Sequence, residues 1–500
     1  MNQIKTGAII SYVALFLNIV IGLLYTPWMI NTIGKADYGL YTLAMSVISL
    51  FVFDFGLGSA ITRFVSKYLA ENRQDMVDSL LGLVFKLYFI GDCIVLISLS
   101  IIYFFLPSMY QGLTSSELES FKIVYLIAAL FSVISFPFIP LNGIIVSYEK
   151  FIQLKSCDLI HRLIVVALMT GCLLIGAGLY ALIIVNSIAG IVIIVLKLSI
   201  LGKKKIASIR WGYWEKELLK SVLGFSIWVT IIQLAQRCIF NIAPSILAAF
   251  ASSSAITVLG IAICLEGYSY TFANAINGMF LPRVSRMIAS NDRSEILNLM
   301  IRIGRIQIYI IGLICVGFIC LGEEFIHLWL GDGFEQVYIC SLLIILPSFV
   351  QLPQEIGNTT IVAEGKVKLQ AYAFVLMAVV NLLLAYPLTK NFGVVGLCVS
   401  IMVAYLVRTI VMDIVFYRVL HINVFKFVGM SYVKILPSIF IITVCCGTFN
   451  NIYTQGGWIG FIIRVVFCVI FYCLIIWFFS MNKEEKYLIL IPVKKNFNIE

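Results

Sequence analysis

Fourteen hydrophobic segments, each long enough to cross a lipid bilayer, occupy almost all of this 500-residue chain. A transmembrane helix needs about 20 mainly apolar residues to cross roughly 30 Å of hydrocarbon. We place the spans at residues 8–31, 39–62, 80–106, 122–146, 157–176, 178–201, 222–250, 254–282, 301–321, 336–362, 369–388, 393–417, 433–452 and 457–480. Only 12% of the residues are charged, against about 25% in a typical soluble domain. The sequence therefore predicts an all-α polytopic membrane protein with about 14 transmembrane helices and no soluble domain.

Basic residues indicate the orientation of these spans, because Lys and Arg near span ends mark the cytoplasmic side of a membrane. They gather at Lys5, in the connections after the even-numbered spans up to the twelfth, and in the tail around Lys483. The opposite connections hold only Lys35, Lys122 and Lys390. We therefore predict that both termini are cytoplasmic. The net charge of +10 is a topology signal, and we expect no nucleic-acid partner.

The chain also repeats itself. Residues 65–72 (VSKYLAEN) are echoed 219 positions later by residues 284–291 (VSRMIASN), and residues 142–150 are echoed 216 positions later by residues 358–366. Two echoes at nearly one spacing predict two homologous six-span lobes, which an even span count keeps in the same orientation. Such parallel repeats are typical of transporters that work by alternating access, with the substrate near the bilayer midplane where the halves meet.

These echoes define the expected domains. The predicted divisions are an N-lobe at 1–202, a cytoplasmic linker at 203–221, a C-lobe at 222–420, and two further spans with a cytoplasmic tail at 421–500.

Polar stripes on three spans indicate which helices line a cavity, because polar groups that face lipid cost several kcal/mol each. Residues three or four apart lie on one face of a helix. The seventh span carries Ser226, Thr230, Gln233, Arg237, Asn241 and Ser245 at such steps, the eighth carries Glu266, Tyr270, Asn274 and Asn277, and the first carries Ser11, Asn18, Gly22 and Tyr25. We predict that these three spans form the cavity wall.

Arg237 is the sharpest candidate, because an ionisable side chain at membrane depth costs at least about 2.5 to 3.5 kcal/mol. Two interpretations remain open. Arg237 binds the anionic part of a substrate through its fork of donors, or it pairs with Glu266, at similar depth, and fixes the packing of one hairpin. The polar neighbours of Arg237 favour binding.

The carboxylates Asp54, Asp92 and Glu266 also lie near mid-depth. For these residues a structural role stands beside coupling to protons or sodium ions. The glycines of residues 55–60 (FGLGSA) are expected to allow close packing or bending of the second span.

Other kinds of chemistry have little support in the sequence. Thirteen cysteines lie mostly within spans, and the three histidines share no span, so we expect no metal site and no catalytic residues. Nothing resembles a nucleotide-binding loop, and we expect no cofactor. Energy would come from a proton or sodium gradient, or from downstream consumption of the product.

The start of the chain resembles a known family. The residues that carry the likeness are Gly7-x-x-x-Ser11-Tyr12, Tyr25-Thr-Pro-Trp-Met-Ile-Asn31-x-x-Gly34, Tyr38-Gly-Leu-Tyr41, Asp54-Phe-Gly-Leu-Gly-Ser-Ala60 and Arg63-Phe-Val-Ser-Lys67. They are similar to the opening of the bacterial polysaccharide transport family, which includes the Wzx-type O-antigen and capsule flippases of the multidrug/oligosaccharidyl-lipid/polysaccharide exporter superfamily.

The resemblance implies a flippase in the bacterial inner membrane that moves a polyprenyl-diphosphate-linked oligosaccharide from the cytoplasmic to the outer leaflet. It also implies cationic cavity residues that face the diphosphate, a role for Arg237, with Lys86 and Arg162 as weaker candidates. Expected partners are the lipid-linked sugar, membrane lipids, a polysaccharide polymerase and a chain-length regulator. An ion-coupled multidrug-type antiporter is the alternative. A membrane polymerase or glycosyltransferase is disfavoured, because the outer connections are short and the lobes are duplicated.

Overall fold

The computed structural model describes residues 2–202, 216–274, 280, 284, 287–288, 293–453 and 455–487. Its helices in chain order are α1 (Asn2–Ile33), α2 (Lys35–Phe51), α3 (Leu57–Ala70), α4 (Gln74–Met109), α5 (Ser115–Ser135), η1 (Phe136–Phe138), α6 (Leu141–Ser147), α7 (Phe151–Leu174), α8 (Leu179–Gly202), α9 (Lys216–Phe240), α10 (Ala243–Phe250), α11 (Ser253–Asn274), α13 (Arg293–Leu330), α14 (Glu335–Gln351), η3 (Leu352–Gln354), α15 (Glu355–Ala363), α16 (Val367–Val419), α17 (Val424–Val428), η4 (Gly429–Val433), α18 (Lys434–Ile452), α19 (Gly457–Ile475) and η5 (Ile476–Ser480).

The helices account for every predicted span. Ten helical segments among the described residues are long and apolar enough to cross a membrane. One of them, α16, holds two predicted spans, separated by a kink at Gly393 (φ 58°). The remaining predicted spans fall on α1, on α2 with α3, and on α11. The predicted all-α polytopic fold class is therefore confirmed.

The chain divides into two compact units. The first comprises residues 1–260 and 374–401, and the second comprises residues 261–373 and 402–500. In the first unit α2 packs against α5, α9 and α10, α3 packs against α4, α6 and α9, and α7 packs against α1 and α8. In the second unit α13 is central and contacts α14, α15, α18 and α19. The predicted lobes and linker are not tested by this division and stay a prediction.

The second sequence echo coincides with matched local structure. Proline removes a backbone donor and clashes with the carbonyl four residues earlier, so the fourth and tenth predicted spans each break into an α-helix, a short 3₁₀ turn and a second helix. The turns hold Pro137 and Pro353, exactly one repeat spacing apart. The two spans also end alike, at Glu149 (φ 55°) and Gly365 (φ 71°), both in the left-handed region.

The second predicted span is broken as well. Helix α2 ends at Phe51 and α3 begins at Leu57, and Phe55 and Gly56 between them have positive φ values of 50° and 66°. The predicted bending at residues 55–60 is confirmed. Backbone carbonyls released by such a break need donors from elsewhere, because a membrane core offers no water to satisfy them.

Candidate functional site

The polar stripe on α9 supplies donors to this break. The Thr230 hydroxyl donates to the carbonyl oxygen of Phe55 at 2.6 Å, and the Ser226 hydroxyl donates to that of Gly56 at 3.3 Å. Farther along the stripe, Ser245 and Tyr110 share a hydrogen bond between their hydroxyls at 3.1 Å. Part of the stripe therefore faces protein.

Arg237 lies in the last turn of α9 and reaches the end of α2. Its Nη1 donates to the backbone carbonyl of Ser49, and its guanidinium carbon lies 4.9 Å from the centre of the Phe53 ring. The last carbonyls of a helix lack partners within the helix, so Arg237 caps α2 and makes a cation–π contact beside it. Glu266 belongs to the second unit, and its pairing with Arg237 stays a prediction.

Asp54 lies inside the same break. Its Oδ1 accepts hydrogen bonds from the Tyr88 hydroxyl at 2.7 Å and from the backbone N–H of Gly58 at 2.8 Å. The second bond satisfies one of the free N–H groups in the first turn of α3. These contacts match the structural alternative for Asp54, and ion coupling at this residue stays a prediction.

Four more predicted residues of the first unit lie on α9, in the turn after it, and on α4. Gln233 and Asn241 are half-buried on α9 and in the turn after it, and Lys86 is half-buried on α4. Asp92, also on α4, has a buried Oδ1 with no hydrogen-bond partner among the described residues.

The structure does not describe the side chains of three predicted asparagine residues. Asn277 lies outside the described residues, and for Asn18 and Asn274 the structure describes the helix backbone but not the side chain.

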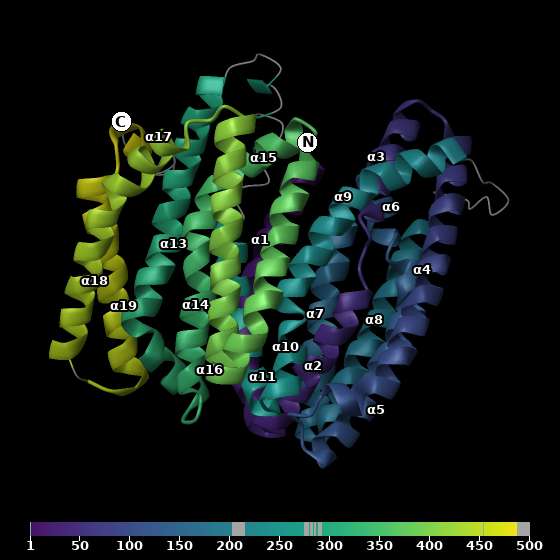
Figure 1. Ribbon diagram of the computed structural model, residues 1–500, viewed down its shortest axis with the longest axis horizontal. Coiled ribbons are helices and arrows are strands. Elements are labelled where there is room, and N and C mark those ends of the chain that lie inside the picture. Colours follow the sequence, from purple (N-terminus) through teal and green to yellow (C-terminus); the bar gives the residue numbers. More distant parts are fainter. Residues whose placement is uncertain are drawn as a thin grey trace. The chain divides into compact units, whose positions relative to one another are not determined.

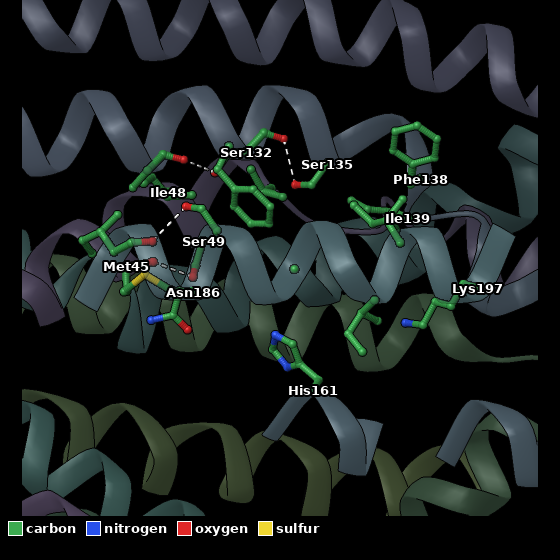
Figure 2. Close-up of a pocket in the computed structure, with 18 of the residues that line it drawn as sticks. Met45, Ile48, Ser49, Ser132, Ser135, Phe138, Ile139, His161, Asn186 and Lys197 are labelled. Atoms are coloured by element: carbon green, nitrogen blue, oxygen red, sulfur yellow. Dashed lines mark hydrogen bonds between the residues drawn. The ribbon is translucent and has the colours of Figure 1, made fainter. Parts of the chain in front are cut away.

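A cavity of about 400 Å³ lies within the first unit, between α2, α5, α7 and α8 (Figure 2). Its polar lining consists of serine hydroxyls, Asn142, Asn186, His161, Asp158 and Lys197. The Asn186 side chain donates to the Tyr41 hydroxyl at 3.0 Å. Tyr41 in turn interacts electrostatically with Arg162 on α7, the residue that follows His161 of the cavity lining.

The second unit holds a cluster of ionisable side chains around Glu266. Glu266 interacts electrostatically with Tyr270 and Tyr405, and Arg408 interacts with Tyr270, Tyr405 and Glu355. Arg408 is only 3% exposed. The cluster brings α11, α15 and α16 together around one cation and two carboxylates.

Arg408 is absent from the residues chosen by sequence. Its signal was present, because it lies in the predicted span 393–417, about 22 Å below the outer end at a rise of 1.5 Å per residue. This span carries no polar stripe, because the residues three and four positions from Arg408 are mainly apolar. In the part of the chain that the structure describes, no group of three or more His, Cys, Asp or Glu side chains could hold a metal ion.

A comparison with known families gives one match, over more than half of the chain. A family model described as "Polysaccharide biosynthesis protein" matches residues 4–282. A search of curated proteins gives no match.

Several solved structures match the fold. "Lipid II flippase MurJ, inward closed conformation" has a TM-score of 0.69 at 15% identity, covering 94% of this chain and 98% of that one. An inward-facing multidrug resistance MATE family transporter of the MOP superfamily has a TM-score of 0.67 at 13% identity, covering 81% and 96%. A MOP superfamily transporter from Pyrococcus furiosus has a TM-score of 0.60 at 13% identity, covering 82% and 94%. At these identities the likeness shows the fold alone, and these proteins are transporters and flippases.

Proposed function

Because the chain belongs to the polysaccharide biosynthesis protein family, we propose that it is a flippase for lipid-linked oligosaccharides. In general terms, it is a multi-pass membrane transporter of the flippase or small-molecule type, and not an enzyme. The proposed substrate is a polyprenyl-diphosphate-linked repeat unit for O-antigen or capsular polysaccharide. The family match carries the proposal, and the fold likeness to a lipid II flippase supports it.

The chemistry of the first unit suits such a substrate. Sugar hydroxyl groups can exchange hydrogen bonds with Gln233 and Asn241 and can donate to Thr230 Oγ1, whose own proton is bonded to the Phe55 carbonyl. A diphosphate can accept from the donors of Arg237 that are not bonded to Ser49. Arginine offers five N–H donors in a planar fork, so one bond to a carbonyl leaves several for phosphate oxygens. Lys86 and Arg162 are further cations for the diphosphate in this proposal.

The alternative is an ion-coupled small-molecule antiporter. The fold likeness to MATE transporters favours it, as do Asp54, Asp92 and Glu266, three carboxylates within predicted spans. In either case a proton or sodium gradient is the proposed energy source. A gradient can drive transport only if a carboxylate binds the ion in one conformation more tightly than in the other.

The proposed setting is the bacterial inner membrane, with both termini in the cytoplasm. Loading from the cytoplasmic leaflet requires membrane enzymes that build the lipid-linked sugar. A polymerase and a chain-length regulator would consume the product on the outer side.

The first experiment is native mass spectrometry of the gently solubilised protein, taken from cells that make the glycan, beside the variant Arg237→Ala. A bound polyprenyl diphosphate with a defined oligosaccharide, lost in the variant, is the expected result. Flipping of that lipid in proteoliposomes tests transport directly. Gradient-driven efflux of organic cations, with no flipping of the lipid, would instead establish the antiporter.

A further inference from the structure

The sequence repeat relates a lysine contact in the first unit to an aspartate in the second. The Lys197 ammonium on α8 donates to the side-chain oxygen of Asn142 on α6 at 2.9 Å, and Asp158 also interacts with this lysine electrostatically. Asn142 is echoed 216 positions later by Asn358 on α15. The residue 216 positions after Lys197 is Asp413, on the last part of α16. A cation in the first unit is therefore replaced by an anion in the second.

Asn358 and Asp413 each have a buried oxygen, Oδ1, with no hydrogen-bond partner among the described residues. Asn358 is 4% exposed, and its Nδ2 donates to Glu355 Oε2 at 2.9 Å. That bond fixes the amide, because the opposite orientation would set its oxygen against the carboxylate. A buried acceptor without a partner is costly. The two oxygens therefore call for a donor or a cation.

Gln354 indicates that these two oxygens lie close together. Its side chain forms a hydrogen bond with Asp413, and its turn, η3, continues directly into α15. Residues four apart on a helix are neighbours on its surface, so Asn358 lies beside the residue that Asp413 contacts. The first unit supports the same arrangement, because Lys197 and Asn142, at the corresponding positions of the repeat, are in direct contact.

The charge of Asp413 also calls for a partner. No cation among the described residues pairs with it, and Arg408, five residues earlier on α16, interacts with Glu355. At 3.6 residues per turn these two positions of α16 lie about 140° apart around the helix. A carboxylate in a membrane span is costly unless its charge is offset. A single carboxylate suits a monovalent cation, whereas divalent sites commonly use several.

We infer that Asn358 and Asp413 bind a monovalent metal cation, sodium or potassium, which occupies in the second unit the repeat position that the Lys197 ammonium occupies in the first. Asp413 lies six residues before the end of α16, or roughly 9 Å at 1.5 Å per residue, so the ion enters from that end. The site is separate from the carboxylates proposed for ion coupling, and it does not depend on the proposed transport function.

The test compares melting temperatures of the full chain in detergent, in sodium chloride, potassium chloride and N-methyl-D-glucamine chloride at equal ionic strength. A cation that binds only the folded protein raises its melting temperature as the concentration of the cation rises. Sodium or potassium should do so, and the bulky organic cation should not. The salt that stabilises identifies the ion. Asp413→Asn should raise the half-saturating concentration at least about tenfold, because it removes a charged ligand.

Asp413→Lys places the residue of the first unit at the corresponding position of the second. Its ammonium can donate to Asn358 Oδ1, so the melting temperature of this variant should no longer depend on the small cation. Asp413→Asn, which keeps the size of the side chain, decides the test if the lysine variant does not fold. Asp158→Asn is the matched control. It removes a carboxylate that already pairs with Lys155 at 3.5 Å, and should leave the cation dependence unchanged.

Three results would each overturn the inference. The first is an equal melting temperature of the wild type in all three salts. The second is binding of radioactive sodium, or of rubidium as a substitute for potassium, that is the same in the wild type and in Asp413→Asn. The third is a cation dependence that Asp413→Asn retains and Glu266→Gln loses, since the ion would then lie at a carboxylate proposed for coupling.

Discussion

Arg237 makes contacts that stabilise the first unit whatever else it binds. Its guanidinium caps the end of α2 at Ser49, while Ser226 and Thr230 bond the carbonyls of Gly56 and Phe55. Carbonyls freed by a break in a membrane helix need such donors, because each unsatisfied polar group in hydrocarbon costs several kcal/mol. A loss of activity on mutation of Arg237 can therefore come from the break as well as from the substrate.

Ser226→Ala separates these two causes. It removes one hydrogen bond to the same break without touching a predicted substrate residue, and should lower the unfolding free energy by about 1 kcal/mol. Arg237→Ala should cost more, about 1.5 to 3 kcal/mol, because the lost donor is charged. Thermal unfolding in detergent measures both. Flipping per folded molecule should persist in Ser226→Ala, disappear in Arg237→Ala and survive in part in Arg237→Lys; equal flipping in the two alanine variants would remove Arg237 from the substrate site.

Helices of the first unit approach closely where glycines meet. A Cβ atom at Gly143 on α6 would lie 2.8 Å from the backbone oxygen of Gly58 on α3, and the neighbour is backbone that cannot turn aside. Small residues that allow backbones to approach are a recurrent means of helix packing in membranes. The pairing of α3 with α6 (Figure 1) therefore depends on this glycine.

Gly143→Ala should destabilise the protein by about 1 to 3 kcal/mol, as overpacking does. Gly171→Ala is the matched control, since no atom lies within 4 Å of its added Cβ in the exposed face of α7. There the better helix propensity of alanine should give a neutral or slightly positive change. Fluorescence-detected size-exclusion chromatography after heating compares the two, and equal stability of both variants would contradict the packing argument.

The C-terminal hairpin, formed by α18, α19 and η5, is followed by Glu485, which forms a buried ion pair with Arg305 of α13. Arg305 Nε donates to Glu485 Oε1 at 2.5 Å, and Arg305 Nη2 donates to the Tyr309 hydroxyl at 2.7 Å and to the Ser480 carbonyl at 2.6 Å. Arg305 and Glu485 are 4% and 3% exposed. Near the other end of the hairpin, Arg464 pairs with Glu324 of α13.

A double-mutant cycle tests this clamp. Glu485→Leu alone and Arg305→Met alone should each cost about 3 to 5 kcal/mol, because each leaves a buried charge without its partner, whereas the double variant should recover much of the loss. Glu71→Gln, at an exposed pair with Lys67, should change stability by less than about 1 kcal/mol. Melting temperatures of the wild type, the two single variants at Arg305 and Glu485 and their double variant measure the coupling, and additive losses would contradict a clamp.

The periodicity of the sequence identified the polar faces of the helices, but not which parts of the protein those faces contact. The stripe on α9 and the bend at residues 55–60 were both predicted. Only the structure shows that side chains of the stripe donate hydrogen bonds to the backbone carbonyls at the bend. Likewise, apolar helices that face lipid and those that face protein have the same composition. The sequence therefore could not reveal that Ile435, Cys468 and Tyr472 of the last two long helices share the core of α13.

At the scale of the whole molecule, the orientation of all fourteen spans rests on the distribution of lysine and arginine. Basic residues near span ends resist translocation, so a single reversed connection would contradict the count for the entire chain. The α4–α5 connection at 110–114 is predicted outside, and the turn at 148–150 between α6 and α7 is predicted inside. The two sites are a matched pair, because they flank one predicted span.

Reporter fusions at these two connections test the predicted orientation directly. Alkaline phosphatase, which folds only outside the cytoplasm, should be active when fused after Gly112 and inactive after Glu149. Green fluorescent protein at the C-terminus should fluoresce, because it matures in the cytoplasm. The predicted orientation would be wrong if alkaline phosphatase were active when fused after Glu149. It would also be wrong if the C-terminal green fluorescent protein fusion did not fluoresce although it was expressed normally. In that case the cavity near Lys197 would face the outer leaflet, and loading from the cytoplasmic leaflet would have to be abandoned.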